Sequence, residues 1–229
     1  MDAIEVPDSP SSRRQVLDAV LRSALAMVPL VGGAGVELFQ AVVNSGREAR
    51  MQAWIADVTQ AINERVLEPR GLDISALATD DGFLDVIGTA TRAAVETSSE
   101  EKIEALRNAV VNATCAPDTE RDRHAILIGI VSSLTPTHIK LLTLFDDPNG
   151  WFARASVPTP NVYMGGAYIV VEAAYPDLAA DSTLLSRVIA DLSRDGLSDI
   201  PLKTMMTSNG VFARRTQPLG EELLRFISA

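Results

Sequence analysis

The sequence predicts a mainly α-helical protein, with an N-terminal helical bundle followed by a winged-helix-like C-terminal module that has a small β-hairpin wing. Apolar residues recur at helical spacing through most of the chain. Glycines, prolines and polar capping residues separate these stretches. Near the C-terminus an Asn-Gly pair stands between two short apolar segments, which indicates a hairpin. We therefore divide the chain into a flexible tail at 1–10, a helical domain at 11–133 and a winged-helix-like domain at 134–229.

Two amphipathic stretches begin the helical domain. The first helix follows Ser11 or Ser12, and Pro29 and the glycine run at 32–35 end it. A second, long helix is expected from about 36 to 67, with a kink or short break at 44–46. The apolar stripe of its second half consists of Met51, Trp54, Ile55, Val58, Ala61, Ile62 and Val66.

Three further helices are expected before residue 134. Asp80 or Asp81 caps the first of them, and Ser98 with Glu101 has the spacing of a capping box for the next. The stretch 125–131 is apolar on every side. Its β-branched residues suit a strand, but amphipathic helices flank it, and we interpret it as a central buried helix. The inward residues of the first of these helices are Phe83, Ile87, Ala90 and Ala94.

The last third of the chain has a different pattern. Thr135 and Pro136 are a capping residue and a first-turn proline, and the turn residues 146–150 end the helix that they begin. Asp181 caps another helix, and Gly196 stands where a C-cap glycine belongs.

A hairpin wing is expected next. Segments 202–206 and 211–215 flank Ser208-Asn209-Gly210, which is a strong turn signal. Thr216 then caps a final helix. Helices followed by a two-stranded wing are the order of a winged helix, a fold that serves both DNA readers and protein-contact modules.

Composition limits the class of partner. The net charge is −10 and the pI is near 4.7, so phosphate and anionic lipid are repelled. Cys115 is the single cysteine, which excludes an internal disulfide and fits the cytoplasm. The acidic start at 1–5 does not resemble an export signal. The most apolar stretch, between Arg22 and Glu37, is shorter than the roughly 20 residues of a membrane span.

Three segments resemble a group of uncharacterised bacterial helical proteins. They are Val28–Gly33, Glu100–Ala113 and Leu134–Leu142. Within 25–151 they are more weakly similar to the abortive-infection alpha type of phage-defence proteins. The resemblance implies a bacterial origin and a defence role, and it assigns no residue a function. The loop at 156–166 departs from the pattern of that group.

No catalytic or metal site is expected from the motifs. The glycine run at 32–35 lacks the lysine of a phosphate loop and the third glycine of a dinucleotide fingerprint. Glu120, Asp122 and His124 fall short of a four-ligand metal site, since Asp122 points away from the other two on a helix. His138 is expected to be partly buried or to cap a helix. We therefore expect no cofactor and no enzyme activity.

The leading hypothesis is a non-enzymatic protein-interaction or sensor protein that binds a protein partner or self-associates. One alternative is a membrane-perturbing defence effector that uses the apolar hairpin 25–36 after conformational release. The hairpin residues are Leu25, Met27, Leu30, Val31 and Val36.

The other alternative is a winged-helix regulator that binds DNA. Its candidate contact surface consists of Arg187, Arg194, Arg214 and Arg215. Residues 131–229 hold 8 basic and 10 acidic residues, which leaves this region near −2. A specific DNA reader usually has a clearer basic face, so the composition favours protein contact.

Overall fold

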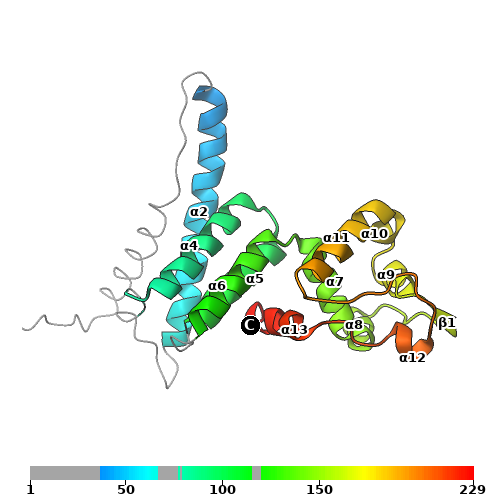
Figure 1. The fold of residues 1–229 in the computed structure, drawn as a ribbon. Coiled ribbons are helices and arrows are strands. Elements are labelled where there is room, and N and C mark those ends of the chain that lie inside the picture. Colours follow the sequence, from blue (N-terminus) through cyan, green and yellow to red (C-terminus); the bar gives the residue numbers. More distant parts are fainter. Residues whose placement is uncertain (1–36, 67–76, 78, 115–119) are drawn as a thin grey trace, which may run out of the picture. The chain divides into compact units, whose positions relative to one another are not determined.

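The computed structural model describes residues 37–66, 77, 79–114 and 120–229. Within these ranges the chain is mainly helical, with one small two-stranded antiparallel sheet (Figure 1). It divides into two compact units. The first contains the described residues up to Ser133 together with Phe226–Ala229, and the second contains Leu134–Arg225. The predicted tail and the first predicted helix lie outside the described residues.

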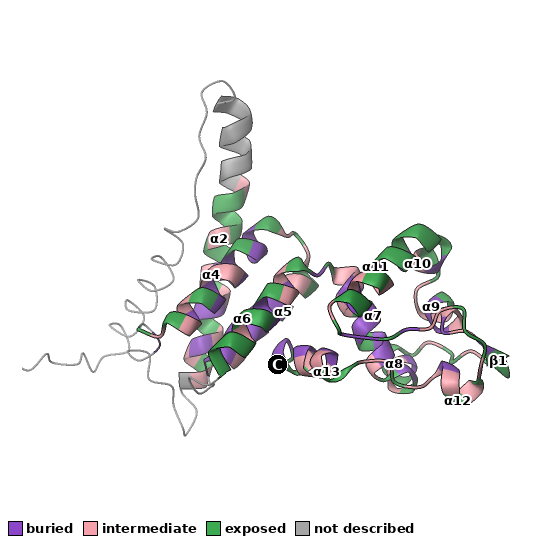
Figure 2. Ribbon diagram, viewed as in Figure 1, coloured by how far each residue is buried: buried purple, intermediate pink, exposed green. Residues whose placement is uncertain are grey.

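Helices pack against one another to form the N-terminal unit. In the described ranges these are α2 (Glu37–Val66), α4 (Asp81–Glu96), α5 (Glu100–Ala113) and α6 (Arg121–Ser133). The contacts of α4 are with α2, α5 and α6, and α2 also packs against α5. Buried residues recur along α4 and α5 (Figure 2). The core of this unit therefore lies around those two helices.

α2 confirms the second predicted helix. Trp54, Val58 and Ile62 form its buried stripe, and the Trp54 Nε1–H donates to Thr91 Oγ1 of α4 at 2.9 Å. The helix runs without a break through Gly46, so the short break at 44–46 is wrong, and the alternative of a kink there stays a prediction. Glycine weakens a helix but keeps its backbone N–H, and the hydrogen-bond ladder can continue through it, as it cannot through proline.

Side-chain caps begin α4 and α5. The Asp80 carboxylate accepts the Phe83 N–H at 3.1 Å, which confirms one of the two predicted caps. The cap of α5 is Ser99, whose Oγ accepts the Lys102 N–H at 3.4 Å, so the prediction of Ser98 was off by one residue. Adjacent serines are equally good caps, and the sequence does not separate them. All four predicted inward residues of α4 are buried, namely Phe83, Ile87, Ala90 and Ala94.

The apolar stretch 125–131 forms a helix, as predicted, but it is not the central one. Leu127, Ile128 and Val131 of α6 are buried, whereas Ile126 is 57% exposed. α6 packs on α4 and α5 with one face only. The central helices are α4 and α5, because each packs against the other and against both α2 and α6.

Shorter elements build the C-terminal unit. Its helices are α7 (Pro136–Asp146), α8 (Pro148–Ala155), α9 (Tyr168–Ala174), α10 (Pro176–Ala180), α11 (Ser182–Arg194), α12 (Ser208–Val211) and the first residues of α13 (Pro218–Phe226). The strands are β1 (Met164–Gly165) and β2 (Met206–Thr207). They pair antiparallel, with Met164 opposite Thr207 and Gly165 opposite Met206.

Several predicted helix ends of this unit are confirmed. Thr135 caps α7 with Pro136 in its first turn, and the Asp181 carboxylate accepts the Leu184 N–H at 2.9 Å to cap α11. Gly196 follows α11 with a φ of +69°, the conformation expected of a C-cap glycine. The predicted stop at 146–150 is confirmed as well, since α7 ends at Asp146 and Asp147 then caps α8.

The predicted hairpin wing is wrong. Residues 208–211 form a helical turn, α12, and β2 pairs with β1 from the distant segment 164–165. The segment 211–215 bonds elsewhere, since the Arg215 N–H donates to Phe145 O at 2.8 Å. The Arg215 guanidinium also donates to Gly210 O at the end of α12. These contacts outweigh the local preference of Asn-Gly for a hairpin turn.

The end of the chain belongs to the N-terminal unit, whereas the sequence assigned it to the second domain. Asn108 Nδ2 donates to Ile227 O at 3.0 Å, and Asn112 Nδ2 donates to Phe226 O at 3.0 Å. α13 begins at Pro218, two residues after the predicted cap, because Thr216 instead pairs with Ser198 in an isolated β-bridge.

Candidate functional site

The first two arginines of the predicted contact surface lie on α11 and are bonded to a carboxylate between them. Arg187 Nε donates to Asp191 Oδ2 at 2.8 Å, and Arg194 Nη1 donates to Asp191 Oδ1 at 2.6 Å. Arg194 Nε also donates to Asp195 Oδ1 at 3.1 Å. The Arg187 hydrogen bond and the nearby positive charges hold the pKa of Asp191 below its ordinary value. The two positive charges are thus largely matched on their own helix.

Asp191 also faces a buried histidine of α7. His138 Nε2 lies 3.6 Å from Asp191 Oδ2, and His138 Nδ1 accepts the Thr135 N–H at 3.2 Å. Thr135 Oγ1 lies 2.7 Å from the same ring nitrogen. The buried position and capping contact predicted for His138 are confirmed. The hydroxyl, imidazole and carboxylate are neighbours here, and they connect the first turn of α7 to α11.

The other two arginines lie between α12 and α13. Arg214 Nε donates to Asp146 Oδ1 at 2.8 Å, and Arg214 Nη1 lies 2.9 Å from Glu221 Oε1. Arg215 is turned toward Gly210 O, as described above. The predicted location of this pair on a hairpin wing is therefore wrong. The structure holds the four arginines through two different sets of carboxylate and carbonyl partners.

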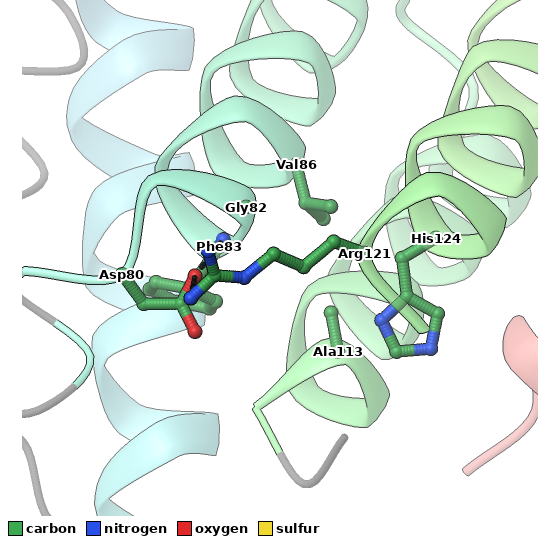
Figure 3. A pocket seen from close by; sticks show the side chains of 7 residues that line it. All are labelled: Asp80, Gly82, Phe83, Val86, Ala113, Arg121 and His124. Carbon is green, nitrogen blue, oxygen red and sulfur yellow. Dashed lines mark hydrogen bonds and ion pairs between the residues drawn. The ribbon is translucent and has the colours of Figure 1, made fainter. Parts of the chain in front are cut away.

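A small pocket lies between α4 and α6 (Figure 3). The Arg121 side chain extends from α6 to Asp80 at the start of α4, with Arg121 Nη2 3.3 Å from Asp80 Oδ1. Gly82 permits this path, because a Cβ there would lie 2.7 Å from Arg121 Cγ. The pocket has a volume of about 10 Å³, which is room for one water molecule. It is a junction between helices and is too small for a substrate.

His124 lies at the edge of this pocket and does not gather metal ligands. Its ring stacks on Phe226 with centroids 5.1 Å apart, and its Nε2 is 3.9 Å from Glu120 Oε2. Among the residues that the structure describes, no three His, Cys, Asp or Glu side chains are grouped to hold a metal ion.

A larger cleft of about 260 Å³ lies between α2 and α5. It approaches the size of small-molecule sites, which begin at about 300 Å³. Its charged lining has both signs, and Arg107 Nη1 already pairs with Asp57 Oδ1 at 3.3 Å. Arg107 Nε also donates to Asn108 Oδ1 at 3.3 Å. The arrangement selects no single class of ligand.

The most unusual surface of the described chain is an apolar one beside the two-stranded sheet. Tyr163 is 93% exposed, Met164 61% and Met205 67%, whereas side chains of this kind are usually covered. We call these three residues the apolar tip. An open hollow adjoins it, lined by Asn161, Val162, Tyr163, Thr207, Ser208 and Asn209.

The two chain segments that carry the apolar tip are almost free of charge, although the Arg215 guanidinium donates to Met206 Sδ at 2.9 Å. Residues 155–166 contain no charged side chain, and Lys203 is the one charged residue in 200–213. Protein interfaces are depleted of charge at their centres and enriched in tyrosine and methionine. The apolar tip has this composition on a chain whose net charge is −10.

Sequence reasoning missed the apolar tip. The stretch 156–166 was interpreted as a loop, and Met205 was assigned to a hairpin strand. Two features of the sequence could have indicated it. One is the uncharged run 155–166, and the other is the position of Tyr163 between a proline-rich segment and two glycines. Only the pairing of β1 with β2 shows that the two segments form one surface.

The predicted apolar hairpin lies outside the described residues. This concerns Leu25, Met27, Leu30, Val31 and Val36. Within the described ranges no single helix is both long and apolar enough to cross a membrane, although α6 and α7 taken together reach the required length and composition.

No family model, curated protein or solved structure matches the chain. The resemblance to abortive-infection proteins stays a prediction.

Proposed function

We propose that the protein is a non-enzymatic protein-interaction protein that contacts its partner through the apolar tip. The observation that supports this most strongly is the exposure of Tyr163, Met164 and Met205 on two segments, 155–166 and 200–213, that hold one charged residue between them. Leaving three large apolar side chains in water forgoes about 1.5–3 kcal/mol for each one that a partner could fully bury. Such a patch marks a contact site on a soluble domain.

We propose further that the C-terminal unit is a winged-helix-like module that contacts the protein partner. A strand, β1, precedes the helices α9, α10 and α11, and a second strand, β2, follows them. In this interpretation the β1–β2 ladder takes the place of the predicted hairpin wing. The carboxylates that bond Arg187, Arg194 and Arg214 favour a protein partner over DNA, because they cancel the charge that phosphate would attract.

Site-specific photo-cross-linking tests this function. A photoreactive phenylalanine analogue replaces Tyr163 in the full chain, and the same analogue replaces Leu184 in a matched control. Leu184 is 46% exposed on α11, outside the apolar tip. We expect a discrete cross-linked product from position 163 and none from position 184 after irradiation in the producing cells.

The product also distinguishes the kinds of partner. A protein adduct at position 163 supports the proposal. The same products from both positions, or no protein adduct from either, would contradict it. If the adduct at 163 contains DNA instead of protein, the DNA-binding alternative replaces the proposal. The defence role implied by the resemblance predicts, in addition, that a Tyr163→Lys variant loses any protection against phage that the wild-type gene confers.

A further inference from the structure

We propose that the open hollow beside the apolar tip binds a neutral sugar. The hollow has a volume of about 320 Å³, within the range of small-molecule sites, which begins at about 300 Å³. Tyr163 is the one residue that belongs both to the lining of the hollow and to the apolar tip. The inference therefore goes beyond the proposed protein contact and does not rest on it.

The lining of the hollow has hydrogen-bonding groups that the protein itself does not use. Asn161 and Asn209 have side-chain amides, and Thr207 and Ser208 have hydroxyls. Within the part of the chain that the structure describes, these four side chains make no hydrogen bond to another protein group. Amides and hydroxyls both donate and accept hydrogen bonds, as the hydroxyls of a sugar do. A sugar can therefore exchange hydrogen bonds with each of them.

An aromatic ring borders these polar groups. Tyr163 lines the hollow and is 93% exposed, so its ring is open to a ligand. The C–H groups on one side of a sugar ring are apolar and slightly positive, and they suit the negative face of an aromatic ring. The buried Val162 adds apolar surface to the lining. The hollow thus combines a stacking surface with polar partners, and a sugar uses both.

The absence of charge from the lining selects a neutral ligand. None of the residues that line the hollow is charged, and a chain with a net charge of −10 repels anions. Arg215 follows these residues in the sequence, but its guanidinium donates to Gly210 O and Met206 Sδ and does not line the hollow. A sugar that bears a carboxylate or a phosphate therefore meets no cation in the lining.

The origin of the polar groups favours a sugar over a nucleoside base, which is another neutral ligand that stacks on tyrosine. The polar side chains come from two separate segments, at 161 and at 207–209. A sugar has hydroxyls all round its ring and can reach partners on both segments, whereas a base has its polar atoms along its edges in one plane. Because the hollow is open and the contacts are few, we expect a dissociation constant on the order of 1 mM.

Two-dimensional NMR of the full chain with isotope-labelled tyrosine rings tests the proposal. The probes are the methyl glycosides of glucose, galactose, mannose and N-acetylglucosamine, each added up to roughly 50 mM. At least one of them is expected to shift the Tyr163 signal saturably. Tyr168 and Tyr175 are the other two tyrosines, and their signals should stay in place. Methyl glucuronide and adenosine are expected to bind more weakly than the best neutral glycoside.

Substitutions in the lining identify the site. Asn161→Ala and Asn209→Ala are each expected to weaken binding roughly fivefold, because each removes a hydrogen bond. Asn149→Ala on α8 is the matched control and should bind like the wild type, since Asn149 is also exposed and does not line the hollow. Followed on the sugar signals, Tyr163→Phe should keep the affinity because it keeps the ring, whereas Tyr163→Ala should lose about tenfold.

Several outcomes would overturn the proposal. They are a Tyr163 signal that no glycoside shifts, tighter binding of the glucuronide or of adenosine, unchanged affinity in both lining asparagine variants, and an equal loss in Asn149→Ala. Circular dichroism confirms that each variant is folded. Asn161 and Asn209 lie outside the apolar tip, so their variants should still give the protein adduct at position 163. Failure of sugar binding therefore leaves the proposed function standing.

Discussion

Different interactions stabilise the N-terminal unit and the C-terminal unit internally. The described helices of the N-terminal unit are 13 to 30 residues long and pack through side chains. Helices of the C-terminal unit are 4 to 13 residues long, and backbone bonds between distant segments join them. Examples are the Asp199 N–H to Arg215 O at 3.0 Å and the Gln217 N–H to Leu197 O at 2.8 Å. Long helices are therefore specified by local pattern, and short ones by contacts made at a distance.

Side chains from distant segments also bind helix ends in both units. In the N-terminal unit a side chain from a neighbouring helix caps the last turn of α6, where Lys102 Nζ donates to Ser132 O at 2.7 Å. In the C-terminal unit Asp146 accepts both the Arg214 guanidinium and the Thr216 hydroxyl, the latter at 2.7 Å. That contact spans 70 residues of sequence, so it forms only when the whole unit folds.

The largest expected effect comes from core cavities made in each unit. Leu106→Ala in α5 and Phe145→Ala in α7 remove fully buried side chains, and we expect losses of about 2–5 and about 3–5 kcal/mol. Each unit has its own tryptophan, Trp54 in the first and Trp151 in the second. Urea unfolding is followed by fluorescence in two backgrounds, each of which keeps one tryptophan and replaces the other by phenylalanine. The two backgrounds report the unfolding free energy of the first and of the second unit.

This experiment tests whether the two units unfold independently. We expect each cavity to shift mainly the transition reported by the tryptophan of its own unit. Leu142→Ala in the second unit provides an aliphatic match for Leu106→Ala, since both side chains are fully buried. A single transition at both tryptophans, moved equally by every variant, would show one cooperative unit.

Periodicity predicted the helices whose faces are continuous. α2 and α4 each repeat buried residues at intervals of three or four, and a window of sequence contains enough turns to reveal this. The stretch 125–131 of α6 is apolar at every position, so the sequence does not indicate which of its faces is buried. The central position predicted for this helix is therefore wrong. The hairpin failed for a different reason. Asn209-Gly210 is compatible with a hairpin turn and with a helical turn, and the distant partners Met164 and Phe145 decide between them.

The candidate site was the part that sequence reasoning predicted least well. The four arginines were predicted as a surface that could contact phosphate, and the fold shows that Arg187, Arg194 and Arg214 bond carboxylates instead. Helical spacing could have revealed two of the pairs, Arg187 with Asp191 at i, i+4 and Arg194 with Asp191 at i, i+3. Arg214 with Asp146 could not be foreseen, because 68 residues separate them. The apolar tip likewise joins two segments that the sequence keeps apart.

A pair of glycine substitutions sharpens the comparison with a smaller effect. A Cβ at Gly166 would lie 2.1 Å from Leu202 O, where two backbone segments of the C-terminal unit meet. Gly166→Ala is therefore expected to cost about 1–3 kcal/mol of unfolding free energy. At Gly129, on the exposed side of α6, a Cβ meets no atom within 4 Å. Gly129→Ala should stabilise by about 0.5–1 kcal/mol, because alanine suits a helix better.

Thermal or urea unfolding of the two glycine variants measures these opposite signs. Gly220→Ala repeats the first test, since its Cβ would lie 2.1 Å from Leu197 O. If both C-terminal variants are as stable as the wild type, the close backbone contacts are not required by this unit, and the contrast with the N-terminal helices is lost.

The smallest expected effect is on the dependence of stability on pH. The Gly150 N–H and the Arg154 guanidinium hold the pKa of Asp147 below its ordinary value of 3.8. The folded C-terminal unit therefore binds this proton less readily than the unfolded chain does. The stabilisation is complete above 3.8 and is lost as the pH falls through the lower pKa of the folded state. Burial lowers the pKa of Lys102 from its ordinary value of 10.5. The unfolded chain therefore binds this proton more readily, and the contribution of Lys102 to the stability of the N-terminal unit increases as the pH rises toward 10.5.

The two units should thus respond to opposite ends of the pH scale. The urea concentration at the unfolding midpoint, reported by Trp151, is expected to decrease as the pH is lowered from roughly 5 to 2. Asp147→Asn should flatten part of that slope, because asparagine still caps α8 but does not titrate. Asp177→Asn is a matched control on α10. Parallel acid slopes for the wild type and Asp147→Asn would mean that this cap contributes nothing to the acid sensitivity of the unit, and that other carboxylates, Asp191 first among them, account for it.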